Sequence, residues 1–359
     1  SLPITSERPD AGPWWGRSMQ NASEHNRRFA ALAAMGFERV EAPQIERQAE
    51  PVGRRRVRVT HRLPAMGTEV AISVVVRSPG QADEAIGRVL EEMDRLIAIF
   101  SHYESGTAAT ELNHQGRLDR PPPELTRVVE DALSYHRLTR GGFDITVAPV
   151  VELFRERRSS GGLPAAAEVR EALELVGSGQ LQLSDRRIRF TRQGMRLTLD
   201  GIAKCYIVDS MARVLESHRI RHYLLEAGGD IRVRGSRGDR QPWRVAVRDP
   251  DGGPDFPDQI ELSGGAVATS GSYEEFYDPE REHHHIISAD SGASPQQTKS
   301  VTVIAPEALA ADALATSVFL MEPSAGLAFL ETLRGCEGLI IGHNDTRMKT
   351  RGWHSAAVL

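Results

Sequence analysis

The sequence predicts an α+β fold in which packed helices cover mixed or antiparallel sheets. Predicted strands and helices follow one another without the regular strand-helix-strand repeat that builds a parallel, doubly wound sheet. The 359 residues are 40% hydrophobic and 26% charged, an ordinary globular composition that allows a large core. No internal repeat or low-complexity tract interrupts the pattern.

Local signals predict where individual elements begin and end. Residues 59–76 are predicted as strand and turn, with Met66-Gly67-Thr68 in the middle. Ser78-Pro79 then opens a helix, because Pro is favoured in the first helical turn and Gln81 is placed for a capping box. The remaining elements follow from hydrophobic spacing. They are helices over residues 124–139, 166–176, 204–217, 309–321 and 325–333, a hairpin over residues 181–199, and strands over residues 223–225, 231–233, 243–247 and 301–304.

Two regions are predicted along the chain, an N-terminal appendage over residues 1–57 and a folded domain over residues 58–359. Prolines and a run of arginines near residue 55 set the appendage apart, and we expect it to be partly extended with one short helix at residues 24–35. A solvated charge run explains the arginines without any partner.

Charge and cysteine content exclude several classes of protein. A net charge of −5 with mixed signs gives no basic surface for phosphate backbones, so nucleic acid is not an expected partner. No apolar run approaches the ~20 residues that cross a bilayer. The two cysteines, Cys205 and Cys336, are too few for a disulfide framework and too isolated for a zinc motif.

Asp312 and Thr316 are candidates for holding a metal ion. They stand four apart near the start of an apolar helix, so both side-chain oxygens project from one face. Hard oxygen ligands of this kind suit Mg²⁺, which leaves the rest of its octahedron to phosphate and water. The alternative is an ordinary helix whose Asp favours the positive end of the dipole.

Lys204 and a run of three histidines are the other candidates. Lys204 follows a glycine and opens a helix, where backbone N–H groups and the ammonium form an anion site fit for a diphosphate; a solvated lysine is the alternative. Adjacent histidines point to different sides, so His283, His284 and His285 cannot all bind one ion. One of them acting as a general base is more economical, because a pKa near ~6.5 suits proton removal from an alcohol.

Taken together, the motifs of residues 60–359 resemble the ApbE-type FAD:protein FMN transferases. Each motif is weak alone, but their order along the chain is specific. They are Ala65-Met66-Gly67-Thr68, Phe100-Ser101-His102-Tyr103, the run from Gly142 to Pro149, Gly201-Ile202-Ala203-Lys204 with Tyr206 and Asp209, Gly228-Gly229-Asp230, the run from Ala268 to Tyr273, His284-His285-Ile286-Ile287, the run from Val301 to Pro306, and the run from Ala311 to Thr316.

The resemblance implies a fold with an FAD cleft between lobes and a Mg²⁺-dependent reaction. In that reaction, FMN passes from the substrate FAD to a Ser or Thr hydroxyl in a flavinylation motif of an acceptor flavoprotein, and AMP is released. The residues implied to contact FAD are Met66, Tyr103, Gly142, Phe143, Asp144, Thr198, Lys204 and Ile287. The implied metal ligands are Gly201, Asp312 and Thr316, and His285 is the implied base.

The chain departs from the family pattern at three places. Thr198-Leu199-Asp200-Gly201 stands where the family usually has Asp-Leu-Gly-Gly, and on an extended backbone Asp200 would share the face of Thr198. Cys205 replaces a glycine, and Ser288-Ala289 replaces Asp-Pro. Two other functions therefore stay open, an FAD pyrophosphatase that yields FMN and AMP, and a non-catalytic FAD-binding protein. The family usually acts in the cell envelope, but no signal peptide or lipobox is recognised in these residues, and the compartment stays open.

Overall fold

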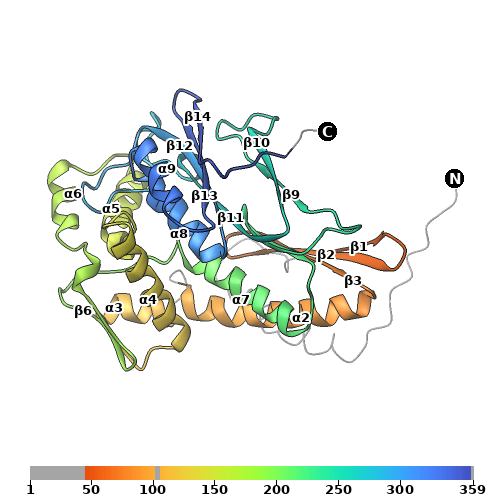
Figure 1. The fold of residues 1–359 in the computed structure, drawn as a ribbon. Helices are drawn as coiled ribbons and strands as arrows, with labels where there is room; N and C mark the ends of the chain where they lie inside the picture. The colour runs from red at the N-terminus through yellow and green to blue at the C-terminus, as the bar shows by residue number, and fades with distance from the viewer. Residues whose placement is uncertain (1–44, 102–105, 357–359) are drawn as a thin grey trace.

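The computed structural model describes residues 45–101 and 106–356, and its centre is a nine-stranded antiparallel sheet (Figure 1). Every neighbouring pair in this sheet is antiparallel. In spatial order the strands are β1 (Glu46–Val52), β2 (Arg56–Ala65), β3 (Thr68–Val76), β7 (Tyr223–Ala227), β8 (Asp230–Arg234), β11 (Gly264–Gly271), β12 (Thr298–Ala305), β13 (Glu337–Gly342) and β14 (Arg347–Lys349).

Helices and two small sheets surround the main sheet, which confirms the predicted α+β class. The helices are α2 (Pro79–Phe100), α3 (Ala108–Gln115), α4 (Pro123–Leu138), α5 (Ala148–Ser159), α6 (Ala166–Leu173), α7 (Ala203–Ser217), α8 (Ala308–Phe319) and α9 (Pro323–Glu331). The small sheets are the hairpin of β9 (Trp243–Val247) with β10 (Asp258–Leu262), and the sheet of β4 (Arg117–Asp119), β6 (Arg187–Phe190) and β5 (Leu181–Ser184). In the described ranges no helix is long and apolar enough to cross a membrane.

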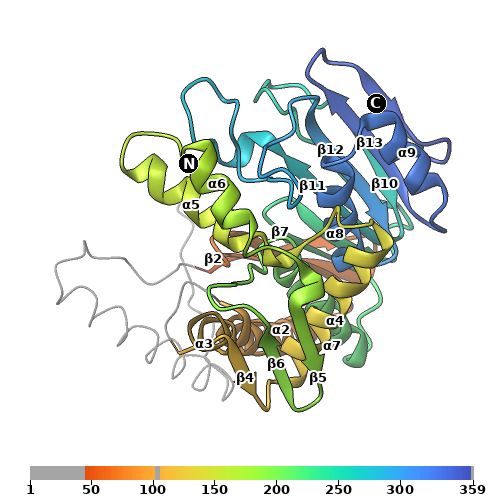
Figure 2. The same cartoon turned by 90° about the vertical axis from the view of Figure 1, so that its left-hand side faces the viewer.

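The main core lies between one face of the sheet and the helices α2, α7 and α8 (Figure 1). A second apolar cluster on the opposite face joins the β9–β10 hairpin to β11 and β13. Figure 2 shows that α3, α4 and the small three-stranded sheet gather at one end of the molecule. The segment between α4 and α7, which includes β5 and β6, belongs to the same end of the molecule. These elements together form a lobe beside the main sheet.

The predicted turn between the first two strands and the predicted start of the first long helix agree with the structure. Strands β2 and β3 form a hairpin whose two turn residues, Met66 and Gly67, both have positive φ, at 52° and 73°. Such φ values belong to the turn that matches the twist of paired strands. Helix α2 begins after Ser78, whose hydroxyl accepts from the N–H of Gln81 at 3.4 Å.

The predicted local structure was wrong at two places. The predicted hairpin over residues 181–199 ends at Phe190, because the Asn113 amide bonds both backbone groups of Leu197, at 2.8 and 2.9 Å, in place of a partner strand. No strand is predicted at Ala268, but residues 264–271 form β11. This strand is buried on both faces, with Ala266 and Ala268 in one core and Val267 in the other, so its sequence does not alternate.

At the N-terminal end, β1 pairs with β2 along its whole length and forms an edge of the main sheet. It falls inside the segment predicted as an appendage, so the sheet extends past the predicted boundary at residue 58. The predicted helix at residues 24–35 lies outside the described residues. The two-region division of the chain stays a prediction.

The start of α8 is fixed by a buried carboxylate from another helix. Asp209 of α7 accepts from the backbone N–H groups of Ala308 and Leu309 at 3.0 and 2.9 Å. It also pairs with Arg232 of β8 at 3.1 Å. Burial raises the pKa of Asp209, although the backbone bonds and Arg232 oppose that rise. This residue therefore ties α7, β8 and α8 together.

We expect Asp209→Ala to lower the free energy of unfolding by about 3 kcal/mol, because it leaves Arg232 unpaired in a largely buried position and removes a helix cap. Urea denaturation followed by circular dichroism measures this change. The control is Glu91→Ala on the exposed side of α2, for which we expect a change within about 0.5 kcal/mol. A loss for Asp209→Ala no larger than the control's would contradict the role given to this carboxylate.

Candidate active site

A cleft of about 830 Å³ lies between the lobe and the main sheet, and most of the predicted site residues line it. Both the lobe and the helices α7 and α8 contribute to its walls. The predicted residues that line it are Met66, Gly142, Phe143, Asp144, Thr198, Gly201, Lys204, His285, Ile287, Asp312 and Thr316. Tyr103 lies outside the described residues. Side chains predicted from motifs up to 250 residues apart thus meet in one cavity.

Three oxygen-bearing groups at one wall of the cleft form the candidate metal site. Asp312 and Thr316 both line the cleft from α8, and a Cβ added to Gly201 would lie 3.6 Å from the Thr316 hydroxyl. The Thr316 hydroxyl also contacts that of Ser270 at 3.1 Å. Within the described residues, the buried Oδ2 of Asp312 has no hydrogen-bond partner. An orphaned carboxylate oxygen beside a hydroxyl is a set of hard donors that fits Mg²⁺.

One ammonium offsets part of the negative charge around Asp312. Lys204 Nζ lies 2.9 Å from Asp230 Oδ2. Burial lowers the pKa of Lys204, but the Asp230 and Asp312 carboxylates outweigh it and hold that pKa above its usual value. Burial and the nearby Asp230 together raise the pKa of Asp312 to about 7. The site thus carries more negative charge than Lys204 neutralises, a condition that a bound cation relieves.

The three consecutive histidines have different surroundings. His284 is 1% exposed, packs edge-on against Phe319 and bonds the Pro295 carbonyl at 3.0 Å, and burial lowers its pKa to about 4. His283 stacks on Phe154 with ring centroids 5.6 Å apart. Of the three, His285 lines the cleft. These contacts give the first two histidines a structural role.

His285 has the electrostatics of a neutral imidazole. Burial lowers its pKa, and the backbone of Glu275 together with the Glu274 and Glu275 carboxylates only partly opposes this effect. Its Nδ1 is buried and has no hydrogen-bond partner among the described residues. The ring is therefore unprotonated at neutral pH and able to accept a proton.

Asp144 lines the cleft, but its carboxylate is already used within the protein. It caps the short 3-10 helix Ile145–Val147 by accepting from the backbone N–H of Thr146 at 2.8 Å, and it also accepts from the hydroxyl of Ser178 at 2.8 Å. His136 Nδ1 lies 3.3 Å away. The side chain thus holds the wall of the cleft in shape.

Thr198 and Asp200 both line the cleft, but they do not lie on a strand, because Asp200 begins a turn and its backbone N–H donates to the Thr198 hydroxyl at 3.2 Å. Leu197 and Leu199 are each 1% exposed, whereas Thr198 and Asp200 both line the cleft. Asp200 lies 3.9 Å from Arg155 of α5, a cleft residue that motif reasoning missed. Arg155 pairs with Glu275, which lies 120 residues later, so this ion pair leaves no local signal in the sequence.

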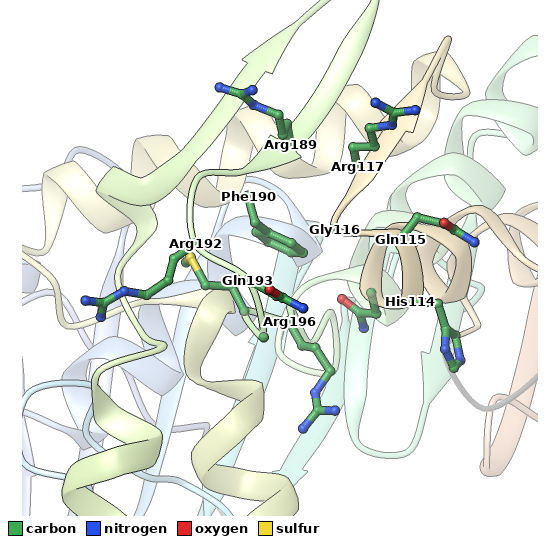
Figure 3. A pocket seen from close by; sticks show the side chains of 12 residues that line it. His114, Gln115, Gly116, Arg117, Arg189, Phe190, Arg192, Gln193 and Arg196 are labelled. Atoms are coloured by element: carbon green, nitrogen blue, oxygen red, sulfur yellow. The ribbon is translucent and has the colours of Figure 1, made fainter.

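A second cavity of about 600 Å³ shares no residue with the cleft (Figure 3). It lies between α3 and the segment after β6, and four arginines line it. In Figure 3 Phe190 lies near the centre of the view, and the guanidinium groups of Arg117 and Arg189 extend away from it. None of the predicted site residues belongs to this cavity, so the chemistry is assigned to the cleft.

Comparison with known proteins identifies the family of the chain. A sequence model of the ApbE family matches residues 66–340, a range that includes every residue lining the cleft. The chain belongs to the ApbE family. It is 30% identical to the FAD:protein FMN transferase of Salmonella typhimurium over 71% of this chain and 76% of that protein. The same identity holds for the FAD:protein FMN transferase of Vibrio cholerae, over 75% of this chain and 83% of the relative.

The fold is also that of solved family members. The crystal structure of the ApbE protein from Thermotoga maritima superposes with a TM-score of 0.73 at 27% identity. The match covers 86% of this chain and 97% of that protein. The predicted ApbE-type fold is therefore confirmed.

We expect Asp312→Asn to stabilise the metal-free protein by about 2 kcal/mol near pH 8, because ionising this buried carboxylate costs free energy in the folded state. Below about pH 4 the carboxyl is protonated in both states and the gain should vanish. As pH rises toward 7 the unfolded chain ionises first, so the gain should grow. Urea denaturation with chelator across this pH range measures it. A gain independent of pH, or a loss near pH 8, would contradict the raised pKa.

Proposed function

We propose that this chain is an FAD:protein FMN transferase that moves FMN from FAD to a Ser or Thr hydroxyl of an acceptor flavoprotein. The observation that carries the proposal is the cleft, in which the buried Asp312 carboxylate, a cationic Lys204 and His285 with its lowered pKa line one cavity. Relatives of this chain are named for that activity. Phosphoryl transfer requires groups that offset the charge of the diphosphate, which suits a metal ion and Lys204, and a base for the attacking hydroxyl, which suits His285.

In this proposal Asp312, Thr316 and the Gly201 carbonyl would hold a Mg²⁺ ion. Such an ion supplies Lewis acidity toward the diphosphate of FAD. Lys204, kept charged by its acidic neighbours, attracts the same diphosphate. Phe143 and Met66 add apolar surface to the cleft for the flavin end of the substrate.

His285 is assigned as the general base. It takes the proton of the acceptor hydroxyl while that oxygen bonds to the FMN phosphorus, and the bond to the bridging oxygen breaks so that AMP leaves. An alcohol is a poor nucleophile at neutral pH unless a group nearby accepts its proton. The lowered pKa of His285 keeps the imidazole ready for that step.

Asp200 is assigned the FAD-binding role that the family usually gives to an aspartate at the position of Thr198. Both residues line the cleft two positions apart, which supports the exchange. Arg155, close to Asp200, would orient that carboxylate.

The activity test measures AMP from FAD and Mg²⁺, with and without an acceptor that carries an Asp-Gly-x-Ser/Thr-Gly-Ala-Thr segment. We expect AMP and a covalently flavinylated acceptor only when that acceptor is present. A matched acceptor with Ala in place of the Ser or Thr should give neither product. AMP without acceptor would make the chain an FAD pyrophosphatase, and no AMP under any condition would make it an FAD-binding protein.

We expect His285→Ala to lower single-turnover FMN transfer by about 10²–10⁴-fold, the usual loss for a general base, while FAD affinity stays nearly unchanged. His283→Ala is the control, because His283 lies in the same segment and stacks on Phe154 outside the cleft lining. Transfer rates come from rapid-quench assays and affinity from flavin fluorescence. Parallel losses of affinity and rate would instead mean that His285 shapes the pocket.

A further inference from the structure

One group of buried side chains offers more ligand atoms than the proposed magnesium site uses. Among the described residues, Cys205, Asp230 and Asp312 offer ligand atoms that all lie within 4.8 Å of one another. We propose that these three side chains form a binding site for a soft divalent cation such as Zn²⁺ or Co²⁺, with the Cys205 sulfur as the ligand that selects it. The inference rests on these residues and not on the transfer reaction.

The three ligands come from three rigid elements that converge beside the cleft. Cys205 lies in the first turn of α7, Asp230 begins β8, and Asp312 lies on α8. Both carboxylates line the cleft, whereas Cys205 is 0% exposed. A cation therefore reaches the site from the cleft, with the thiol as its innermost ligand.

The distances suit one ion. The Cys205 sulfur lies 3.3 Å from Asp230 Oδ2. Ligands of a tetrahedral ion, with metal–sulfur bonds near 2.3 Å and metal–oxygen bonds near 2.1 Å, lie about 3.5 Å apart. The three ligand atoms lie within 4.8 Å of one another, so small side-chain rotations bring them to the spacing that one ion needs. A purely structural cluster would explain the bond from Cys205 to Asp230, but not the buried Asp312 oxygen that has no hydrogen-bond partner in the described chain.

Charge balance also favours a cation here. Lys204 is the ammonium that pairs with Asp230, at 2.9 Å. On binding, the thiol releases its proton to solvent as the metal–sulfur bond forms. Two carboxylates and one thiolate are then balanced by the divalent ion and Lys204 together, so the buried group becomes neutral.

Sulfur decides which cation binds. Thiolate ligands favour zinc and other soft or borderline ions, whereas Mg²⁺ takes oxygen ligands. Because Asp312 belongs to both ligand sets, a soft cation held by Cys205 would compete with Mg²⁺ for that carboxylate. The departure from the family's glycine at this position thus adds a second metal preference to the same wall of the cleft.

The test is a Co²⁺ titration of the full chain, stripped of metal and kept reduced, without FAD. We expect one Co²⁺ per chain and a thiolate-to-cobalt charge-transfer band in the near ultraviolet. Cys336→Ser should keep that band, because Cys336 is the chain's other cysteine, is also buried, and stands outside the cluster. Cys205→Ser should lose the band and bind Co²⁺ at least about tenfold more weakly, since even the loss of an outer-shell partner has that effect.

Absence of the band from the parent at saturating Co²⁺ would overturn the proposal. So would a band that persists in Cys205→Ser. The parent and Cys336→Ser decide the question even if Cys205→Ser fails to fold. Because no FAD is present, the result is independent of whether the chain transfers FMN.

Discussion

The structure depends on one electrostatic constraint, the burial of two carboxylates beside a single ammonium. Asp230 and Asp312 face Lys204 at the wall of the cleft, and taking such ions out of water costs several kcal/mol per ion in real proteins. That cost is tolerable only where the groups cannot move apart. The fold meets this condition by placing them at the start of a central strand and on two packed helices, with Asp209 fixing the start of α8.

Burial acts on the pKa of Lys204 and of His285 in the cleft, but their neighbours decide the outcome. It lowers the pKa of both Lys204 and His285, since each is a base. Carboxylates overcome the effect at Lys204, which stays charged, and fail to do so at His285, which stays neutral. One cavity therefore holds a permanent cation and a free base at the same pH, the separation of roles that acid-base enzymes achieve by environment.

The sequence predicts those parts of the fold whose signals are local. Helix α2 was predictable from its cap and its apolar spacing, and the β2–β3 hairpin from the turn at Met66-Gly67-Thr68 in the middle of a strand-like run. Strand β11 was not, because both of its faces are buried and small residues such as Ala266 hide its period. The order of the motifs along the chain predicted most of the residues that line the cleft. It did not predict Arg155, because its partner Glu275 is distant in sequence.

Cys205 shows how a departure from a family pattern acquires meaning only in the fold. In the sequence it is one of two isolated cysteines, with nothing nearby that resembles a metal motif. The fold brings it beside Asp230, which follows it by 25 residues, and beside Asp312 from another helix. A glycine there offers no side chain, so the two carboxylates alone would face the cation. In the proposed site Cys205 adds a sulfur ligand from the first turn of α7, where its side chain is completely buried.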